Sequence, residues 1–306
     1  MGDLFTTATL GVLLVSFGVN IVVGLTGMGG GALMTPALIF LGIPPTAAVA
    51  NDLVAAALNK SVGAAVHARS GSPNLRLAVW LIVGSVPAAL GGAFLLKLVV
   101  PAGNQQEWLK LAIGATLLLT ALTYLLRMYL NLVRPSTRGN LEIRVQPVPT
   151  VLVGIAGGLL VGLTSVGSGS LIMVALLLIY PRLTPRRMVG TDLVQAIPLV
   201  IAAAIGHVIV SGVDWNVLIP LVVGGAPGVY LGAKLAARVP QGVIRRGIVL
   251  VLTLTALTLL TVPPAWVGVI GAVLVILGPA AWGILRDRTL KHRAEAAAHA
   301  APDDEF

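Results

Sequence analysis

The chain of 306 residues contains no cysteine, few aromatic residues and little charge. The absence of cysteine excludes disulfides, thiolate metal sites and cysteine nucleophiles. Only 10% of the residues are charged, 57% are hydrophobic, and the mean hydropathy is +0.98. A soluble domain has about 25% charged residues, and a disordered chain combines high charge with low hydrophobicity. The composition therefore excludes both classes and indicates a membrane protein.

Apolar runs of transmembrane length recur along nearly the whole chain, which predicts an all-α polytopic membrane protein. The 36 glycines suit close helix packing and interrupted helices in a bilayer. We predict apolar runs at residues 4–25, 31–43, 46–68, 75–98 and 107–131 in the first half, and at 148–163, 170–180, 187–210, 215–237, 242–262 and 264–285 in the second.

Two Gly-rich segments of nearly the same sequence indicate an internal repeat. Residues 23–38 read VGLTGMGGGALMTPAL and residues 161–176 read VGLTSVGSGSLIMVAL, with nine of sixteen positions identical. Further on, the repeat aligns Asp52 with Asp192 and His67 with His207. General apolar similarity would not align acidic residues inside apolar runs, so the repeat reflects two related halves.

The repeat divides the chain into five segments. We predict a first repeat at 1–131, a cytoplasmic linker at 132–147, a second repeat at 148–262, an extra transmembrane helix at 263–285 and a cytoplasmic tail at 286–306.

The basic residues give the two repeats opposite orientations. If each long run crosses the bilayer once, 17 of the 20 Lys and Arg residues fall on one side, with Lys97 and Lys110 opposite and Lys60 inside a run. By the positive-inside rule that side is the cytoplasm, which predicts an outside N-terminus and a cytoplasmic C-terminus in the cell membrane. The isoelectric point near 10.7 then reflects membrane orientation and not nucleic-acid binding. Inverted-topology repeats of this kind occur in many secondary transporters.

The runs at 31–43 and 170–180 are too short to cross a hydrocarbon core of about 30 Å. Each therefore forms a re-entrant hairpin with the run before it, and each repeat consists of this broken hairpin and three transmembrane helices. The two hairpins enter from opposite faces. Their Gly-rich tips, 26–31 and 164–170, are expected to meet near the midplane of the bilayer.

The two tips are candidates for an anion site. A helix N-terminus carries free backbone N–H groups and a partial positive charge, and glycine lets a ligand approach that backbone closely. Two such ends facing each other in a membrane suit an anionic substrate, whereas the alternative is that the small residues only pack helices together. The predicted substrate-binding residues are Thr26, Gly29, Gly30, Gly31, Asn51, Lys60, Thr164, Gly167, Ser168, Gly169, Ser170 and Thr191.

Titratable residues inside the apolar runs are candidates for coupling or for organising the site. Asp52 and Asp192 are intramembrane carboxylates, which are costly and indicate function. Lys60 has Val200 at the equivalent position of the repeat. It pairs with an aspartate or with the substrate, or its ammonium group extends toward the membrane interface. His67 and His207 are matched in the repeat, but each is also compatible with a capping or interface role.

The tips, VGLTGMGGG and VGLTSVGSGS, each followed by an Asp-bearing run, resemble the sulfite exporter TauE/SafE family of membrane transporters. The resemblance covers about residues 8–262 and implies export of a small sulfur-containing anion, such as sulfite or a short organosulfonate like sulfoacetate. It also implies a substrate site at the two tips and at the polar residues downstream of them.

Two other classes of function remain open from the residues alone. Asp52 and Asp192 could carry a cation or a metal, although the positive helix ends at the tips oppose this. Ser168 or Ser170 with His207 could form the dyad of an intramembrane serine hydrolase, although an inverted repeat has no evident use there. We predict a transporter and not an enzyme, without cofactor or bound metal. The expected partners are a small anion and the lipid bilayer, and a homodimer is left open.

Overall fold

The computed structural model describes residues 7–26, 30–67, 73–133, 144–167, 169–181, 183, 185–236, 238–239 and 241–299. Helices account for nearly all of these residues, and no strand occurs among them. In the first half the helices are α1 Thr7–Thr26, α2 Gly31–Phe40, α3 Pro45–His67, α4 Leu75–Val99, the short 3-10 helix η1 Ala102–Asn104, and α5 Gln105–Val133. In the second half they are α6 Pro147–Thr164, α7 Leu171–Ile179, α8 Pro185–Ser211, α9 Trp215–Leu235, α10 Gln241–Leu259 and α11 Pro264–His299.

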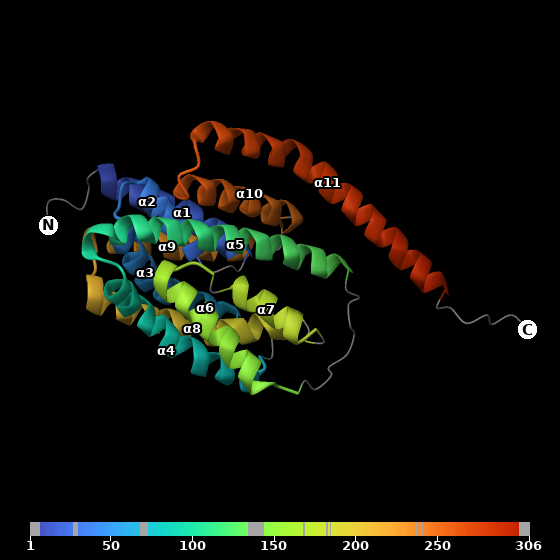
Figure 1. Ribbon diagram of the computed structural model, residues 1–306, viewed down its shortest axis with the longest axis horizontal. Helices are drawn as coiled ribbons and strands as arrows, with labels where there is room; N and C mark the ends of the chain where they lie inside the picture. The colour runs from blue at the N-terminus through green and yellow to red at the C-terminus, as the bar shows by residue number, and fades with distance from the viewer. Residues whose placement is uncertain are drawn as a thin grey trace, which may run out of the picture.

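The long helices lie side by side in a bundle, with α11 on its outside (Figure 1). Seven helices in the described part of the chain are long and apolar enough to cross a membrane. The short helices α2 and α7 have 10 and 9 residues and are about 14–15 Å long, which is half of a hydrocarbon core. The protein is therefore an all-α polytopic membrane protein.

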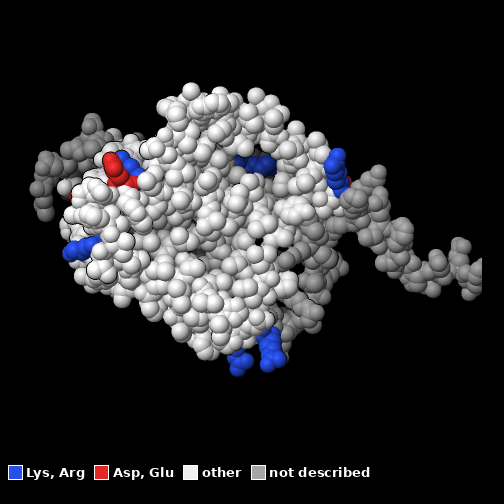
Figure 2. All heavy atoms as spheres, viewed as in Figure 1, with Lys and Arg blue, Asp and Glu red and all other residues white. Residues whose placement is uncertain are grey.

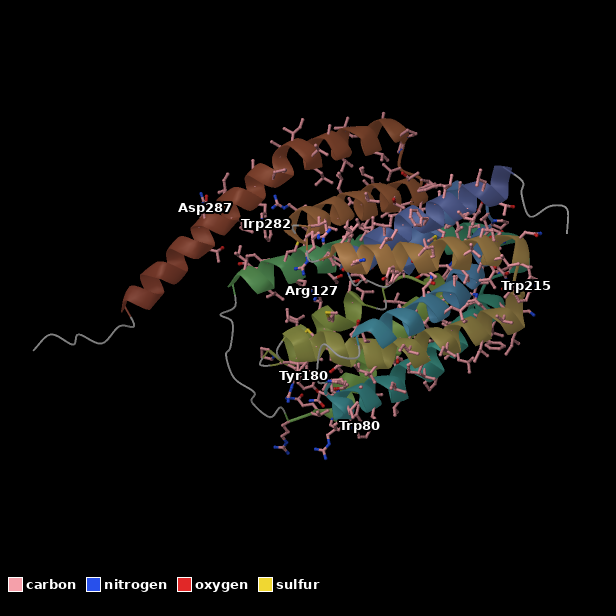
Figure 3. All side chains as sticks on the ribbon, turned by 180° about the vertical axis from the view of Figure 1, so that it is seen from behind. Trp80, Arg127, Tyr180, Trp215, Trp282 and Asp287 are labelled. Carbon is pink, nitrogen blue, oxygen red and sulfur yellow. The ribbon has the colours of Figure 1, made fainter. Side chains whose placement is uncertain are left out.

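The surface of the bundle suits a bilayer. Most of the face in Figure 2 is uncharged, with basic atoms visible in a recess near its upper middle and the other charged side chains near its edges. Large apolar side chains are exposed along the outer helices, for example Leu98 at 85% and Ile276 at 71%. Trp80 lies toward one end of the bundle and Trp215 at the other, as expected of side chains at membrane–water interfaces (Figure 3).

The two halves of the chain are packed into each other. The helix α1 pairs with α9, and α6 pairs with α4, with more extensive contact than between any other helices. Glycines make these contacts possible, since a side chain at Gly24 would collide with the carbonyl oxygen of Val229, and one at Gly162 with that of Ala89. Such small-residue contacts let two backbones approach closely in a membrane. The first helix of each half thus packs on the fourth helix of the other half.

The hairpins α1–α2 and α6–α7 start at opposite ends of the bundle. Gly154 and Gly162 of α6 face Leu81 and Ala89 of α4 in turn, so these two helices are parallel. The contacts of Gly224 and Gly232 with Leu13 and Ile21 show in the same way that α1 and α9 are parallel.

The helices α4 and α9 themselves begin at opposite ends. The backbone N–H of Asn74, before α4, donates to the hydroxyl of Thr191 near the start of α8, at 3.0 Å. The start of α9, by contrast, shares a cleft with Thr46 at the start of α3. We call the end where α4, α6 and α8 begin the basic end, because Arg76, Arg144 and Arg187 lie there. This arrangement is the one that inverted repeats would produce.

The predicted runs agree closely with the observed helices, but two details differ. The helix α1 follows α9 as far as Gly232, near the basic end, so α1 passes well beyond the midplane and only α2 stops partway. The first hairpin therefore consists of a long helix and a short return helix. In addition, the extra helix and the start of the predicted tail form one continuous helix, α11.

We predict that the basic end faces the cytoplasm. Because the chain has no cysteine, single cysteines introduced at Gly103 and Gly242 can report on the two ends. Neither added Cβ would collide with a neighbour. A membrane-impermeant maleimide applied to intact cells should label Gly103→Cys and should label Gly242→Cys only after permeabilisation, by the positive-inside rule. Labelling of Gly242→Cys in intact cells would show that the orientation is the opposite of the predicted one.

Candidate functional site

The tips of the two hairpins meet inside the bundle. Gly31, the first residue of α2, lies against the backbone carbonyl of Ser165, the residue that follows α6. A side chain at Gly31 would collide with this carbonyl. Ser165 has a φ of 60°, and its N–H caps α6 by donating to the carbonyl oxygen of Val161 at 2.8 Å. Segments 134 residues apart thus form one contact.

Asp52 joins these two tips to α3. Its Oδ2 atom accepts a hydrogen bond from Thr35 Oγ1 of α2 at 2.5 Å and from Ser165 Oγ at 2.8 Å. The side chain is 2% exposed. Hydrogen bonds to a charged group contribute about 1.5–3 kcal/mol each, and the loss of one partner would leave a buried carboxylate incompletely satisfied. Asp52 therefore holds the contact between the two halves in place.

Asp192 has a different environment from Asp52. It accepts a hydrogen bond from Gln195 Nε2 at 3.0 Å, within its own helix α8. The position that corresponds to Thr35 in the repeat is Met173, which offers no hydroxyl donor. The two carboxylates, equivalent in sequence, are therefore not equivalent in structure.

Basic side chains surround Asp192 and link it to Asp52. Lys60 of α3 lies within electrostatic range of both carboxylates. Arg127 of α5 also lies within electrostatic range of Asp192. Charge interactions therefore join Asp52 to Lys60, Lys60 to Asp192 and Asp192 to Arg127.

The predicted hydroxyl groups are mostly engaged within their own segments. Thr26 Oγ1 donates to the carbonyl of Val22 at 2.8 Å, and Thr164 Oγ1 donates to that of Leu160 at 2.6 Å. Thr191 Oγ1 donates to Arg187 at 2.7 Å. Each threonine has a single hydroxyl proton, so in this conformation these side chains do not supply donors to a substrate.

Asn51 lies on the side of Asp52 away from the basic end. Its amide donates to the carbonyl of Ala47 at 2.8 Å, while its buried Oδ1 has no hydrogen-bond partner in the described part of the chain. Asn51 lines an open cleft of about 460 Å³ between the start of α3 and the α8–α9 connection, which includes Asp214. Of the predicted site residues, Asn51 thus lines a cleft away from the contact of Gly31 with Ser165.

The structure describes some of the remaining predicted tip residues. Gly30 precedes α2 with an ordinary φ of −60°, whereas Gly167 has a φ of 102°, a conformation that favours glycine. Ser170 is buried immediately before α7, and Gly169 lies next to it in the turn. Gly29 and Ser168 lie outside the described residues.

Of the two matched histidines, only His207 has a described side chain. His207 is buried, and its Nε2 lies 2.6 Å from the carbonyl oxygen of Gly162. A carbonyl only accepts, so Nε2 carries the proton and His207 ties α8 to α6. Its Nδ1 has no partner in the described part of the chain, so neither nitrogen is bonded to a described serine such as Ser170. His67 ends α3, and its side chain lies outside the described part.

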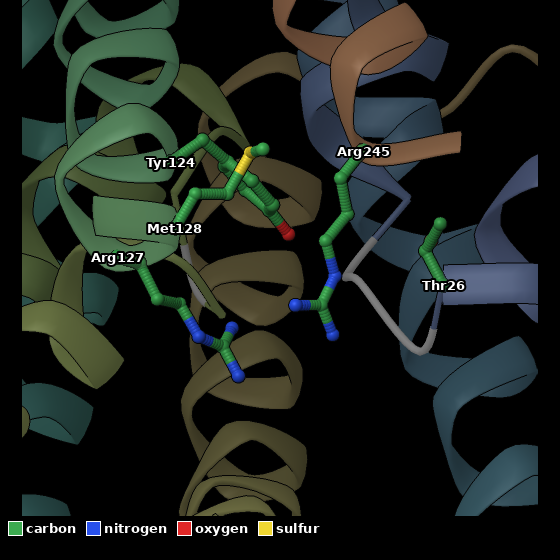
Figure 4. A pocket seen from close by; sticks show the side chains of 5 residues that line it. All are labelled: Thr26, Tyr124, Arg127, Met128 and Arg245. Atoms are coloured by element: carbon green, nitrogen blue, oxygen red, sulfur yellow. The ribbon is translucent and has the colours of Figure 1, made fainter. Parts of the chain in front are cut away.

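A small cavity lies next to Thr26, at the end of α1 (Figure 4). It has a volume of about 30 Å³ and is lined by Thr26, Tyr124, Arg127, Met128 and Arg245. Four of these five residues are absent from the predicted site. In the sequence, Arg127 and Arg245 are two of the 17 basic residues that indicate the orientation in the membrane. The structure places both side chains, from α5 and α10, partly buried at this cavity.

The described His, Asp and Glu side chains are not arranged as a metal site. Among the described residues, no three His, Cys, Asp or Glu side chains come together in a group that could hold a metal ion. Asp52 and Asp192 both interact with the positive charge of Lys60, which opposes a cation between them. The site is better described as a contact between two tips, with an arginine-lined cavity on one side and an open cleft on the other.

We predict that Gly31→Ala destabilises the protein, whereas Gly30→Ala does not. The methyl group at position 31 would collide with the Ser165 carbonyl, while at position 30 it would meet only a side-chain atom of Val23 at 3.9 Å. Overpacking of this kind costs about 1–3 kcal/mol. Thermal unfolding of the purified variants in detergent measures the difference, and equal midpoints for the two variants would contradict the tip contact.

Comparison with known proteins agrees with this architecture. The sequence matches the family described as Sulfite exporter TauE/SafE over residues 12–259. It is 37% identical over 233 residues to the probable membrane transporter protein YjnA of Bacillus subtilis (strain 168), covering 75% of this chain and 91% of that protein.

Two further relatives carry similar names. The probable membrane transporter protein YdhB of the same organism is 31% identical over 252 residues, covering 81% of this chain and 99% of the relative. A probable membrane transporter protein of Xylella fastidiosa (strain 9a5c) is 28% identical over 223 residues, covering 72% of this chain and 82% of the relative. No solved structure gives a significant match.

The family match covers most of the chain, including both tips and both intramembrane aspartates, and the relatives are aligned over nearly their full length. The chain belongs to the sulfite exporter TauE/SafE family, a family of membrane transporters.

Proposed function

We propose that the protein is a secondary transporter that carries a small anion past the contact between its two hairpin tips. The observation that supports this most strongly is the meeting of Gly31 and Ser165, which come from opposite halves and from hairpins that start at opposite ends. A cavity lies toward the basic end and a cleft toward the other. A substrate bound at the tips would therefore be reached from one end or the other as the halves move.

The chemistry of the tips favours an anion over a cation. The helix α2 begins at the contact and directs its first N–H groups and the positive end of its dipole toward it. The helix α7 begins a few residues after Ser165 in the equivalent way. Lys60 and Arg127 add positive charge nearby. A helix N-terminus typically contributes about half a positive charge. Two such ends together with the basic side chains suit a monovalent or divalent anion.

The proposed substrate is sulfite or a short organosulfonate such as sulfoacetate, and the proposed direction is export. This rests on the family description, since the names of the relatives give no substrate. We place the protein in the cell membrane with an outside N-terminus and a cytoplasmic C-terminus, so that an exported substrate would enter from the basic end.

Flux measurements in proteoliposomes test this function. Purified protein should exchange sulfite or sulfoacetate across the membrane faster than protein-free liposomes, and it should not carry divalent cations such as Mg²⁺ or Zn²⁺. Taurine and acetate serve as controls for net charge and for a carboxylate group. Cation flux without anion flux would support the alternative in which Asp52 and Asp192 bind a cation.

We predict that the two aspartates act differently, Asp192 in coupling and Asp52 in assembly. Asp52→Asn weakens two charge-assisted hydrogen bonds and should lower stability by about 1–3 kcal/mol, measured by thermal unfolding. Asp192→Asn removes a carboxylate held by one side-chain hydrogen bond, so it should change the pH profile of flux while the protein stays folded. An unchanged pH profile in Asp192→Asn would exclude proton coupling through this residue.

A further inference from the structure

The cavity beside the end of α1 has an unusual charge distribution. Arg127 and Arg245 extend from α5 and α10 toward the same space (Figure 4). None of the five lining residues carries a carboxylate. Two like charges that lie this close repel each other, so without a ligand both side chains would be expected to turn outward into water. Their convergence therefore calls for a counter-charge.

The two guanidinium groups have capacity for a ligand. Within the described part of the chain, neither Arg127 nor Arg245 forms a hydrogen bond or an ion pair. The adjacent Arg246 differs, because it is exposed and its Nε donates to the carbonyl oxygen of Gly242 at 3.1 Å. The nearest carboxylate with which Arg127 interacts, Asp192, is shared with Lys60.

We propose that this cavity binds the oxyanion head group of the transported anion, a sulfite or a sulfonate, between Arg127 and Arg245. The proposal rests on the proposed transport function and adds to it a site that the tip residues alone do not provide. The shape of guanidinium supports it, because each group can offer two parallel N–H donors to two oxygens of one oxyanion. Buried Tyr124 adds a hydroxyl on the same side (Figure 4).

The position of the cavity agrees with such a head group. Its volume of about 30 Å³, room for roughly two water molecules, disfavours a bulky ligand. Thr26 links the cavity to the tip of the first hairpin, because this residue ends α1 and lines the cavity. Arg245 lies near the start of α10, at the basic end. A substrate approaching from that end would therefore meet the arginines before the tip contact.

The charged side chains of the interior leave a positive balance for an anion. The residues that interact there are Asp52, Lys60, Asp192, Arg127 and Arg245. Three of these side chains are basic and two are acidic, so one positive charge remains when all are ionised. The helix ends at the tips add partial positive charge to it. The balance therefore favours an anionic head group over a neutral or cationic one.

Binding measurements on the full-length protein in nanodiscs test this site. Titration calorimetry with sodium sulfite and with sulfoacetate gives the affinity of the wild type and of Arg127→Gln, Arg245→Gln and Arg246→Gln. Each of the first two variants loses charge-assisted hydrogen bonds and should weaken binding by about tenfold or more. The matched control Arg246→Gln should change the affinity by less than about twofold, because exposed charges contribute little.

Two more conservative variants separate a loss of binding from a loss of folding. Arg245→Lys keeps the charge but loses the planar fork, and Tyr124→Phe keeps the packing but loses the hydroxyl. Both should weaken binding if the cavity holds the head group. Unchanged affinity in Arg127→Gln, Arg245→Gln and Arg245→Lys, each with wild-type thermal unfolding, would overturn the proposal.

Flux through the same variants separates this proposal from the transport function. If the wild type carries sulfite and the arginine variants bind and carry it equally well, the cavity proposal is wrong and the transport function stands. If the wild type binds sulfite through the arginines but does not carry it, the cavity is supported and the transport function is wrong. If the wild type neither binds nor carries either anion, both proposals fail.

Discussion

The contact between the hairpin tips is the constraint on which the rest of the structure depends. The start of α2 and the end of α6 approach so closely that position 31 admits only glycine, and Asp52 accepts hydroxyl donors from both sides. A buried carboxylate is stable only when such donors are held in place. The helix pairs α1–α9 and α4–α6 hold them, since each pair joins one half of the chain to the other.

We locate the chemistry of transport at the positions where the two repeats differ. A perfectly repeated structure would give Asp52 and Asp192 the same partners. Instead, Asp52 is bonded by two hydroxyls, whereas Asp192 interacts with Arg127 in addition to Lys60, with which both aspartates interact. The proposal that follows is a division of labour, in which one carboxylate keeps the halves assembled and the other lies beside the positive groups that an anion would meet.

Much of the fold could be predicted from the sequence, because apolar run length and glycine content determine where helices begin and end in a bilayer. The run predicted at 75–98 is the helix Leu75–Val99, and the run at 215–237 is Trp215–Leu235. The depth of α1 was not predictable, because it depends on how α1 packs against α9. The contact between the tips could be predicted, because the runs that follow them are too short to cross the bilayer and occur in both repeats.

The candidate site was predictable only in part. Duplication identified the tips and the two aspartates, but the role of Ser165 depends on a backbone φ of 60° that brings its hydroxyl to Asp52. Arg127 and Arg245 are 118 residues apart, and a basic residue near the end of an apolar run ordinarily indicates membrane orientation. Only the packing of α5 on α10 shows that both side chains reach one cavity.

The central claim is that an anion binds beside the contact of the two tips. The most direct measurement is the structure of the protein with selenite, an electron-dense analogue of sulfite whose selenium can be located by anomalous scattering. The account predicts a selenium peak between the guanidinium groups of Arg127 and Arg245 or at the start of α2. A peak confined to the cleft near Asp214, or no peak at concentrations that saturate transport, would contradict it.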